Sequence, residues 1–578
     1  MNRLSILKTV LVTVASLLTP QFGGYLLANS DESAAKPNII FILADDQGWN
    51  GTSVQMHPDI PNSKSDFYRT PNIEKMAASG IRFSHAYAPG PMCSPSRASF
   101  QTGKSPAQLR MTNVGGGRRG RGASPSQRVI VPPHSSKLPA KEITIGETLQ
   151  SAGYATAWFG KWHLGADGPG AHGYDEHDGA TGNNEGDTDD PDNPKDIFGI
   201  TDRGIKFMEK NVKAEKPFYL QLWHYAVHGS VQGKDETKKA YEARRSGTVH
   251  DSTEFAAMTE NLDTGVGMIL DKVKELGISD NTYIIYMSDH GAGRKMSSNA
   301  PLKLGKGSLW EGGLRVPLII VGPGVKSNAF CASPTVGWDM FPTFCDLAGV
   351  DGPLPDGLEG VSLRPVFETG KGELGRSGNQ IAFHFPHYGN EPPMSTITVD
   401  GFKLVKLYDS NETNLYDLNK DIGESKDISK QEPEKTAKLD RQLTEYLKSI
   451  DAGIPTANPD FDPNASPEES GGRAGRRGGG GRRGGGRQAQ QEQRKKEVTE
   501  LEAAFKNEDM EKCGQLIVAM KKAIEDAPAR GRGRAGGQGN SPGGRRLQAI
   551  EALEKAHEAD DKEKLGELIE QMTRRFKS

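Results

Sequence analysis

The sequence predicts an α/β fold with a large, mixed, mostly parallel sheet that is flanked by helices. Four short apolar runs have the length and residue types of strands that are buried on both faces: 38–44, 154–160, 217–223 and 282–287. Helix-like segments lie between them, at 71–78, 143–152, 205–211 and 254–276. Strands that alternate with helices favour a parallel or mixed sheet.

Polar residues follow each of the four apolar runs. Asp45 and Asp46 follow the first run, and Asp289 follows the fourth. Ligands of parallel α/β sheets bind at the carboxyl ends of the strands. The sequence therefore predicts one shared rim for these side chains: Asp45, Asp46, Lys161, His163, His228, Asp289 and His290.

Length, charge and cysteine content exclude several classes of protein. A formal net charge of −3 over 578 residues excludes a uniformly basic nucleic-acid binder and a highly acidic disordered chain. Four cysteines exclude a disulfide-dense miniprotein and a CxxC-type zinc cluster. Cys331 and Cys345 could pair in an exported protein, but their spacing leaves this open.

The N-terminus has the order of regions found in a secretory signal peptide. Arg3 and Lys8 precede the apolar stretch 9–18, and small residues follow up to Ala28. We expect residues 1–28 to be removed and the mature chain to be periplasmic or secreted, without a membrane span. An uncleaved N-terminal anchor is the alternative.

A smaller α+β subdomain is expected after the catalytic domain. The α/β pattern extends over 36–375, and shorter alternating pieces at 380–384 and 395–407 with a helix at 432–450 indicate the subdomain at 376–454. Residues 455–490 are rich in Gly, Arg and Pro, which is typical of a linker.

The last part of the chain contains an internal repeat. Residues 501–517 match residues 553–569 at a constant offset of 52. Each copy resembles two short helices joined at an acidic turn, so helical repeats are expected at 491–527 and 547–578, with a second linker at 528–546. Such a helical-repeat tail favours an accessory or interaction module, whose partner stays unknown.

Adjacent carboxylates at Asp45 and Asp46 indicate a cation site. Two negative charges side by side are unfavourable unless a cation lies near them, and calcium prefers carboxylate oxygens. Asp289, at the end of another strand, would add a third carboxylate to the same rim.

The segment 93–104 reads Cys-Ser-Pro-Ser-Arg-Ala-Ser-Phe-Gln-Thr-Gly-Lys. It resembles the C-x-P-S-R…T-G signature of formylglycine-dependent (type I) sulfatases, in the alkaline-phosphatase-like superfamily. Further similarity covers roughly residues 36–450, at 44–48, 160–165, 260–263, 288–291, 305–313 and 415–418, the last together with Asp421 and Glu424. The resemblance implies an alkaline-phosphatase-like fold and hydrolysis of sulfate monoesters.

The resemblance also implies roles for individual residues. Cys93, oxidised to formylglycine by a maturation system, would be nucleophile and metal ligand, and its hydrate would be held by Arg97. The calcium (Ca2+) site would be completed by Asp45, Asp46, Asp289 and His290. Lys161 and Lys306 would grip sulfate oxygens, His163 would take the hydrate proton, and His228 would act as general acid with Lys306.

The sequence departs from the family pattern at three positions. His290 stands where the family often has Asn, Lys104 where Arg is usual, and Val227 where Pro often precedes the leaving-group histidine. His224 therefore remains a competitor of His228 for that role.

Other motifs favour structural interpretations. Residues 115–120 fit GxGxxG, but no helix pattern follows, so a basic loop is favoured over a dinucleotide site. Behind a signal peptide, the Arg/Gly run at 471–487 favours a solvated linker over a nucleic-acid site. His384 and His387 are equally compatible with lining the pocket and with supporting the smaller domain.

We therefore expect a sulfatase whose substrate is a sulfated small molecule, a sulfated carbohydrate being favoured, and which binds no nucleic acid. Two alternatives remain open. One is a phosphomonoester or phosphonate-ester hydrolase of the same superfamily. The other is a non-catalytic protein that binds sulfated glycans with Cys93 unconverted.

Overall fold

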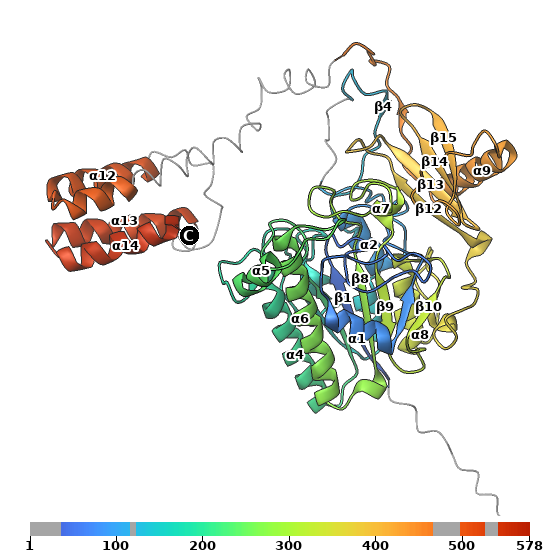
Figure 1. Ribbon diagram of the computed structural model, residues 1–578, viewed down its shortest axis with the longest axis horizontal. Helices are drawn as coiled ribbons and strands as arrows, with labels where there is room; N and C mark the ends of the chain where they lie inside the picture. The colour runs from blue at the N-terminus through green and yellow to red at the C-terminus, as the bar shows by residue number, and fades with distance from the viewer. Residues whose placement is uncertain (1–35, 116–122, 466–497, 526–541, 578) are drawn as a thin grey trace, which may run out of the picture. The chain divides into compact units, whose positions relative to one another are not determined.

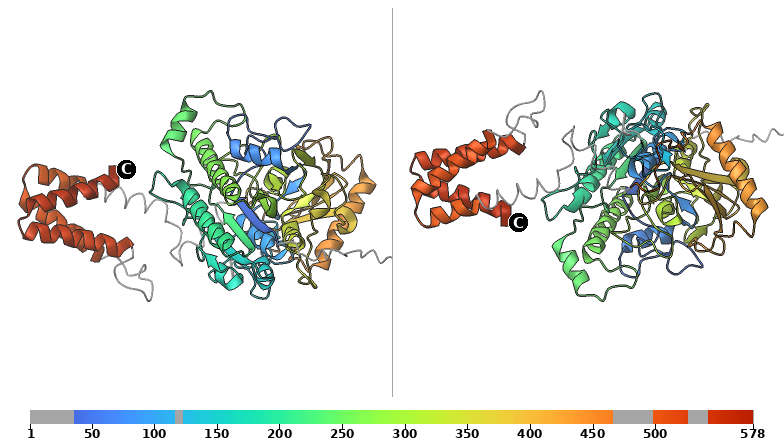
Figure 2. Two further views of the ribbon diagram at one scale, coloured as in Figure 1. Left: turned by 90° about the horizontal axis from the view of Figure 1, so that it is seen from below. Right: turned by 90° about the horizontal axis from the view of Figure 1, so that it is seen from above.

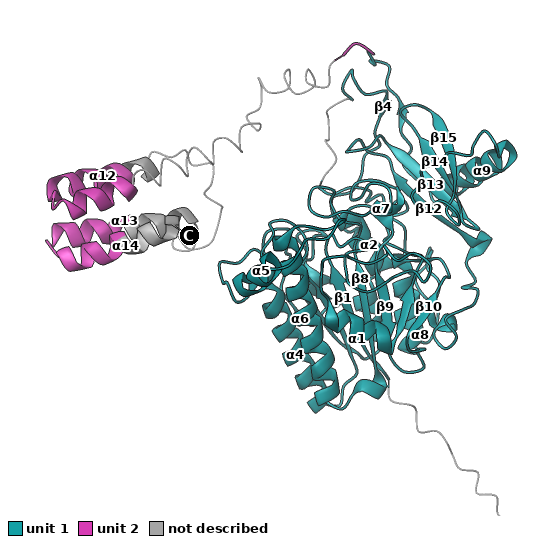
Figure 3. Cartoon of the chain, in the orientation of Figure 1, with its two compact units in different colours: residues 1–462 teal, residues 463–578 magenta. Residues whose placement is uncertain are grey.

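The computed structural model describes residues 36–115, 123–465, 498–525 and 542–577 (Figure 1). The expected signal peptide at 1–28, most of the basic loop at 115–120 and most of both expected linkers lie outside these residues. The chain divides into two compact units, residues 1–462 and 463–578 (Figure 3). No helix in the described residues is both long enough and apolar enough to cross a membrane.

The four predicted strands form the centre of an eight-stranded sheet. They are β1 (Asn38–Ala44), β5 (Ala155–Gly160), β7 (Phe218–Trp223) and β8 (Thr282–Ser288). They lie side by side in the order β8-β1-β7-β5, and every pair is parallel. The predicted α/β fold with a mostly parallel sheet is confirmed.

Shorter strands extend this sheet on both sides. β6 (Glu176–His177) is parallel to β5, whereas β9 (Leu318–Val321) is antiparallel to both of its neighbours, β8 and β2 (Ile81–Phe83). β10 (Ala329–Cys331) closes the order β10-β2-β9-β8-β1-β7-β5-β6. The antiparallel strand β9 makes the sheet mixed.

Helices cover both faces of the sheet, because alternate residues of each strand face opposite sides. Phe41 of β1 belongs to one apolar core and Ile42 to the other. On one face lie α1 (Pro71–Ser79), α4 (Ile197–Lys213) and α6 (Thr253–Glu275), of which α4 and α6 run together in Figures 1 and 2. On the other lie α2 (Cys93–Thr102), α3 (Ile145–Ser151) and α8 (Met340–Leu347).

Local signals start these helices. α1 begins at Pro71. Asp263 of α6 caps this helix, because its carboxylate accepts hydrogen bonds from the N–H groups of Asn72 (3.1 Å) and Ile73 (2.8 Å) in the first turn. α3 begins at a capping box formed by Thr144 and Glu147. Asp263, in the segment at 260–263 that resembles a family motif, thus has a structural contact here.

A four-stranded antiparallel sheet follows in the first unit. It consists of β12 (Gln380–Phe385), β13 (Met394–Val399), β14 (Phe402–Leu407) and β15 (Glu412–Asp417), paired in chain order. α9 (Pro433–Ser449) covers one face through Leu439, Leu443 and Leu447. The piece expected at 395–407 is therefore a hairpin, β13 and β14, rather than one strand.

The remaining elements of the first unit are short. Helical elements are α5 (Asp235–Glu242) and α7 (Glu311–Leu314). Two-residue strands are β3 (Ala86–Tyr87), β4 (Val129–Ile130), β11 (Thr335–Val336) and β16 (Thr456–Ala457). β16 pairs with β4, so residues 455–462 belong to the first unit instead of starting the linker that we expected at 455.

The second unit contains two helical hairpins. Residues 498–506 and α12 (Met510–Glu525) form one, and α13 (Pro542–Glu558) and α14 (Lys562–Lys577) form the other. Residues related by the 52-residue offset occupy one shared core, for example Leu501 with Leu553 and Ile517 with Ile569. The two repeats therefore bury their apolar faces against each other.

All four cysteines of the chain are unbonded and buried: Cys93, Cys331, Cys345 and Cys513. The pairing of Cys331 with Cys345, which the sequence left open, does not occur in this structure.

Candidate active site

The site lies at the carboxyl ends of the central strands, as the polar residues there predict. Asp45 directly follows β1 and Asp289 directly follows β8. The N–H of Asp289 donates to the carbonyl of Ala44 (3.1 Å), and the N–H of Asp46 donates to Oδ1 of Asp289 (3.1 Å). The parallel pairing of β1 with β8 thus places the three carboxylates together.

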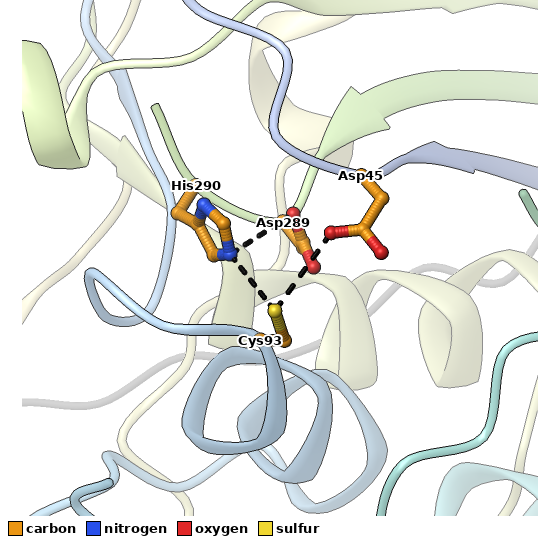
Figure 4. Close-up of side chains that lie close together, drawn as sticks. All are labelled: Asp45, Cys93, Asp289 and His290. Atoms are coloured by element: carbon orange, nitrogen blue, oxygen red, sulfur yellow. Dashed lines mark hydrogen bonds and ion pairs between the residues drawn. The ribbon is translucent and has the colours of Figure 1, made fainter. Parts of the chain in front are cut away.

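Cys93 is the first residue of α2 and is buried against these carboxylates (Figure 4). Its Sγ lies 3.3 Å from Nε2 of His290, 3.6 Å from Nζ of Lys306 and 3.8 Å from Oδ1 of Asp45. An N-terminal helix position favours a negatively charged group, because unpaired N–H groups point toward it. The cysteine of the 93–104 motif therefore lies beside the paired aspartates.

Two fully buried cations lie behind the carboxylates. Arg97, one helical turn after Cys93, donates from Nη2 to Oδ2 of Asp289 (3.0 Å) and from Nη1 to the carbonyl of Lys161 (2.8 Å). Nη2 of Arg97 also lies 3.4 Å from Oδ2 of Asp45. Lys161, just past β5, forms an ion pair with Oδ2 of Asp45.

Lys306 and His228 face the same cluster from the more open side. Nζ of Lys306 lies 2.6 Å from Oδ1 of Asp46, and its side chain is 20% exposed. One ring nitrogen of His228, a carboxylate oxygen of Asp46 and Sγ of Cys93 lie within 4.8 Å of one another. His228 is half-buried, so both side chains can reach solvent and a substrate.

The main chain of His163 contacts Ser94, the residue that follows Cys93. The hydroxyl of Ser94 donates to the carbonyl of His163 (2.8 Å), and Nδ1 of His163 is buried without a hydrogen-bond partner among the described residues. His224, the competitor of His228, instead lies in the interior at the end of β7, where burial lowers its pKa to about 3. The structure brings His228, and not His224, to Cys93.

The charges around Cys93 change its acidity. Burial alone would raise the pKa of the Cys93 thiol, but Lys161, Lys306 and His290 bring it well below its ordinary value. The same balance holds for Asp45, whose pKa is lowered well below its ordinary value by Lys161 and Arg97 against the effect of burial. The site therefore favours an anion at position 93.

The cations near Asp289 and Asp46 do not offset the effect of burial on the pKa of these two carboxylates. Burial, reinforced by the charge of Asp45, raises the pKa of Asp289 to about 7, and burial also raises the pKa of Asp46. Burial lowers the pKa of His290, but the negative charges of Asp289 and Cys93 raise it to about 9. Buried carboxylates that hold their protons this strongly indicate a place for an added cation.

The donor atoms fit a divalent cation. Ligand atoms of Asp45, Cys93, Asp289 and His290 lie within 4.8 Å of one another. Carboxylate oxygens suit calcium, whereas a thiol sulfur and an imidazole are less typical ligands of that ion. An oxygen at residue 93 in place of sulfur would make the set fit calcium better.

The sequence reasoning missed a buried ion network that supports the segment carrying Lys306. Glu311, the first residue of α7, accepts from Nε of Arg315 (2.8 Å) and from Nζ of Lys403 (2.9 Å), a residue of β14. Lys403 also pairs with Oε1 of Glu424 at 2.7 Å, and Oε2 of Glu424 accepts from the N–H of Glu311 (2.8 Å). The resemblance already includes Glu311 in the 305–313 motif and Glu424 in the C-terminal element, but it gives no sign that Lys403 joins them.

Three other sequence candidates have contacts outside the cluster. Lys104 pairs with Glu142 (2.6 Å). His384 lies between the hydroxyl of Ser395 (2.6 Å from Nδ1) and the carbonyl of Gly453 (2.8 Å from Nε2), within the smaller sheet. Nε2 of His387 lies 2.7 Å from the hydroxyl of Thr112. None of the three is among the residues that contact Cys93.

Two known protein families together match most of the first unit. Residues 37–350 match the family described as Sulfatase, and residues 304–452 match the one described as N-sulphoglucosamine sulphohydrolase, C-terminal. A sulfatase of Formosa agariphila is 29% identical over 514 residues, which is 73% of this chain and 91% of that protein. The N-acetylgalactosamine-6-sulfatase of Canis lupus familiaris is 29% identical over 372 residues, which is 58% of this chain and 66% of that protein.

A solved structure extends the similarity to the fold. Ps i-CgsB, determined in complex with k-i-k-neocarrahexaose, has a TM-score of 0.61 and 27% sequence identity, over 71% of this chain and 93% of that chain. Since the family match covers more than half of the chain, the chain belongs to the sulfatase family, has its alkaline-phosphatase-like fold and is a sulfatase.

Proposed function

We propose that this sulfatase releases inorganic sulfate from a sulfated carbohydrate, with Cys93 converted to formylglycine and with a calcium ion held by Asp45, Asp46, residue 93, Asp289 and His290. The observation that carries the proposal is the position of Cys93. Its Sγ lies within 3.3 to 3.8 Å of His290, Lys306 and Asp45, at the start of a helix. The family match favours sulfate esters over the phosphate and phosphonate esters considered above.

The chemistry requires a nucleophile at sulfur, cations for the sulfate oxygens and a proton for the leaving alcohol. When present, the formylglycine hydrate supplies an oxygen nucleophile at residue 93, and the metal ion shares the negative charge that develops on the sulfate group. The remaining tasks fall to side chains of this chain.

Each remaining task has a candidate side chain in the cluster. Lys161 and Lys306 hold sulfate oxygens, because their ammonium groups lie beside the proposed metal ligands Asp45 and Asp46. His228 donates a proton to the leaving oxygen from the half-exposed side. Arg97 holds the group at residue 93, and His163 accepts a proton from it during sulfate release.

The carbohydrate part of the proposal rests on the relatives. One relative is named N-acetylgalactosamine-6-sulfatase, and the solved structure with 27% identity was determined with k-i-k-neocarrahexaose. We propose the same broad substrate class for this chain.

The decisive experiment combines mass analysis with activity. Full-length protein, produced in a host that has a formylglycine-generating system, is digested, and the peptide that contains residue 93 is weighed. We expect the aldehyde or its hydrate, together with release of sulfate from a panel of sulfated sugars. Cys93→Ala should remove all activity, whereas a matched substitution at a distant buried thiol, Cys345→Ala, should keep it.

Two results would contradict the proposal. An intact Cys93 thiol in all active protein would exclude formylglycine, and activity retained in Cys93→Ala would exclude residue 93 as nucleophile.

Export is proposed from the signal-like residues 1–28 and is tested by the N-terminal sequence of the mature protein, which should begin near residue 29.

A further inference from the structure

The loop that carries His228 is anchored on two different sides. β7 ends at Trp223, and the loop begins there. Its first anchor is Asp45, the residue that directly follows β1. The N–H of Asp45 donates to the carbonyl of Ala226 (2.9 Å), and the N–H of Val227 donates to the carbonyl of Asp45 (2.7 Å). Two residues that follow His228, Ser230 and Gln232, have side-chain hydrogen bonds with the segment 182–196 instead. His228 therefore lies between an anchor on the sheet and an anchor on the segment 182–196.

An ion pair between a buried lysine and a partly exposed aspartate is the centre of the second anchor. The side chain of Lys195 is fully buried, and its Nζ pairs with Oδ1 of Asp187. The other carboxylate oxygen of Asp187, Oδ2, accepts a hydrogen bond from the hydroxyl of Ser230 (3.2 Å), two residues after His228. One carboxylate thus joins the segment 182–196 to the loop that carries His228.

Gln232 forms a parallel connection between the same two segments. Its Oε1 accepts from the N–H of Lys195 (2.9 Å) and from the N–H of Thr188 (3.3 Å), and its Nε2 donates to the carbonyl of Thr188 (3.1 Å). A cavity of about 200 Å³ lies between the segments, lined in part by Thr188, Pro194 and Gln232. The hydrogen bonds of Gln232 thus join the two segments beside this cavity.

The backbone of the segment 182–196 has unusual conformations next to these contacts. Lys195 and Asp196 have positive φ values of 57° and 51°, which residues other than glycine adopt only where surrounding contacts hold them. Gly186 lies against the ring of Tyr225, where a Cβ would come within 2.2 Å of Cγ. Contacts on both sides therefore constrain the path of the segment 182–196 beside the loop that carries His228.

We propose that Asp187 and Lys195 are positioning residues for the sulfatase reaction, which hold the 228–232 segment so that His228 can protonate the leaving oxygen. This inference rests on the role of His228 in the proposed function. Nδ1 of His228 lies 2.5 Å from the carbonyl of Gly229, so the conformation of this segment also sets the orientation of the ring. Loss of the Asp187–Lys195 pair should leave the sulfate-binding cations in place and disturb only protonation of the leaving group.

The kinetic test compares two leaving groups. Asp187→Asn, Lys195→Met and the matched control Asp189→Asn, at an exposed neighbouring aspartate, are assayed on 4-nitrophenyl sulfate and phenyl sulfate. General acid catalysis matters more for phenolate, the poorer leaving group. We expect both test variants to lose about tenfold more kcat/KM on phenyl sulfate than on 4-nitrophenyl sulfate, with the control unchanged. Equal losses on both substrates would overturn the proposal.

A second measurement does not depend on turnover. Hydrogen–deuterium exchange of full-length protein should show faster exchange across residues 225–233 in Lys195→Met than in wild type or in Asp189→Asn. Lys195→Met is preferred here because it removes the buried charge, whereas Asp187→Asn leaves it unpaired. Unchanged exchange in this segment would overturn the proposal. A further outcome separates this inference from the proposed function. If His228→Ala loses kcat/KM equally on both substrates while Lys195→Met still exchanges faster, His228 is not the general acid, but Lys195 still anchors the segment.

Discussion

Nζ of Lys403, on β14 of the smaller sheet, lies 2.9 Å from Oε1 of Glu311, the first residue of α7. Both side chains are buried, and Glu311 follows Lys306 by five residues in the segment that supplies one candidate sulfate-binding cation. Residues that lie 92 positions apart thus connect the smaller sheet to the active-site rim. The ion pair therefore ties the smaller sheet to the segment that carries Lys306.

Lys403→Met should destabilise the protein and lower its activity. The substitution leaves Glu424 and part of the charge of Glu311 without their buried cation, and breaking a buried pair costs about 3–5 kcal/mol. Lys406→Met, on the same strand, removes a partly exposed pair with Asp440 and should cost at most about 1 kcal/mol. Urea unfolding of both variants measures the difference. Equal stabilities would exclude a supporting role for Lys403.

Arg97→Lys should lower kcat on sulfate esters by about two to three orders of magnitude, because lysine cannot provide the two-nitrogen contact with Asp289 and the carbonyl of Lys161. Arg110→Lys, at a more exposed pair with Asp451, is the matched control and should retain activity. The measurement is steady-state kinetics on a substrate that the wild type hydrolyses. Wild-type kcat in Arg97→Lys would contradict the assignment.

Removal of calcium should lower both the melting temperature and the activity, and calcium should restore both. A ligand that binds only the folded protein stabilises it by about 2.7 kcal/mol at one hundred times its Kd. Asp289→Asn removes one of the proposed ligands and should lose this calcium-dependent shift. Asp59→Asn, at an exposed position, should keep it. Differential scanning fluorimetry after treatment with EDTA provides the measurement, and a shift that persists in Asp289→Asn would contradict the proposed site.

His384 should make the protein sensitive to acid. Burial lowers the pKa of His384 to about 4, against an unfolded value of about 6.5. The folded state therefore binds fewer protons, and its stability is complete above about pH 6.5 and falls as the pH decreases toward 4, by about 3 kcal/mol in total. His384→Gln should show a flatter stability profile between pH 6.5 and 4 by urea unfolding.

The control for this titration is His177→Gln, at an exposed histidine, which should keep the wild-type slope. A His384→Gln profile as steep as that of the wild type would assign the acid sensitivity to other groups.

The two tail repeats contact each other through equivalent glycines. A Cβ on Gly514 would lie 2.8 Å from Cε1 of His557, and a Cβ on Gly566 would lie 3.0 Å from Cζ of Phe505. Gly514 and Gly566 are related by the 52-residue offset, as are Phe505 and His557. Gly514→Leu should therefore destabilise the tail by about 1–3 kcal/mol through overpacking.

Hydrogen–deuterium exchange of full-length protein can follow this effect. Peptides from 498–521 and 550–569 should exchange faster in Gly514→Leu, while sulfatase activity stays unchanged, because the candidate site lies in the first unit. Gln515→Leu, on an exposed neighbouring position, should not change exchange. Slower or unchanged exchange in Gly514→Leu would show that the glycine is not required for packing.

Much of the fold and of the site could be predicted because the signals are local. A seven-residue apolar run identifies β1, and the rule that ligands bind at the carboxyl ends of parallel strands places Asp45 and Asp289 together. The 93–104 motif is local as well, because Cys93 is identified by the residues that directly follow it in the sequence. The extent of α2 and the hairpin of β13 and β14 were missed, because short segments with mixed polarity carry weak periodicity.

The amino-acid sequence by itself determined the parallel core, the polar rim and the residues of the sulfatase motifs. Only the tertiary structure decided that His228 rather than His224 faces Cys93, that His384 lies inside the smaller sheet, and that Cys331 and Cys345 do not pair. The physical reason is that burial, ion pairing and distance are set by contacts between distant residues. Lys403 with Glu311 and Asp187 with Ser230 are such contacts, and no local pattern encodes them.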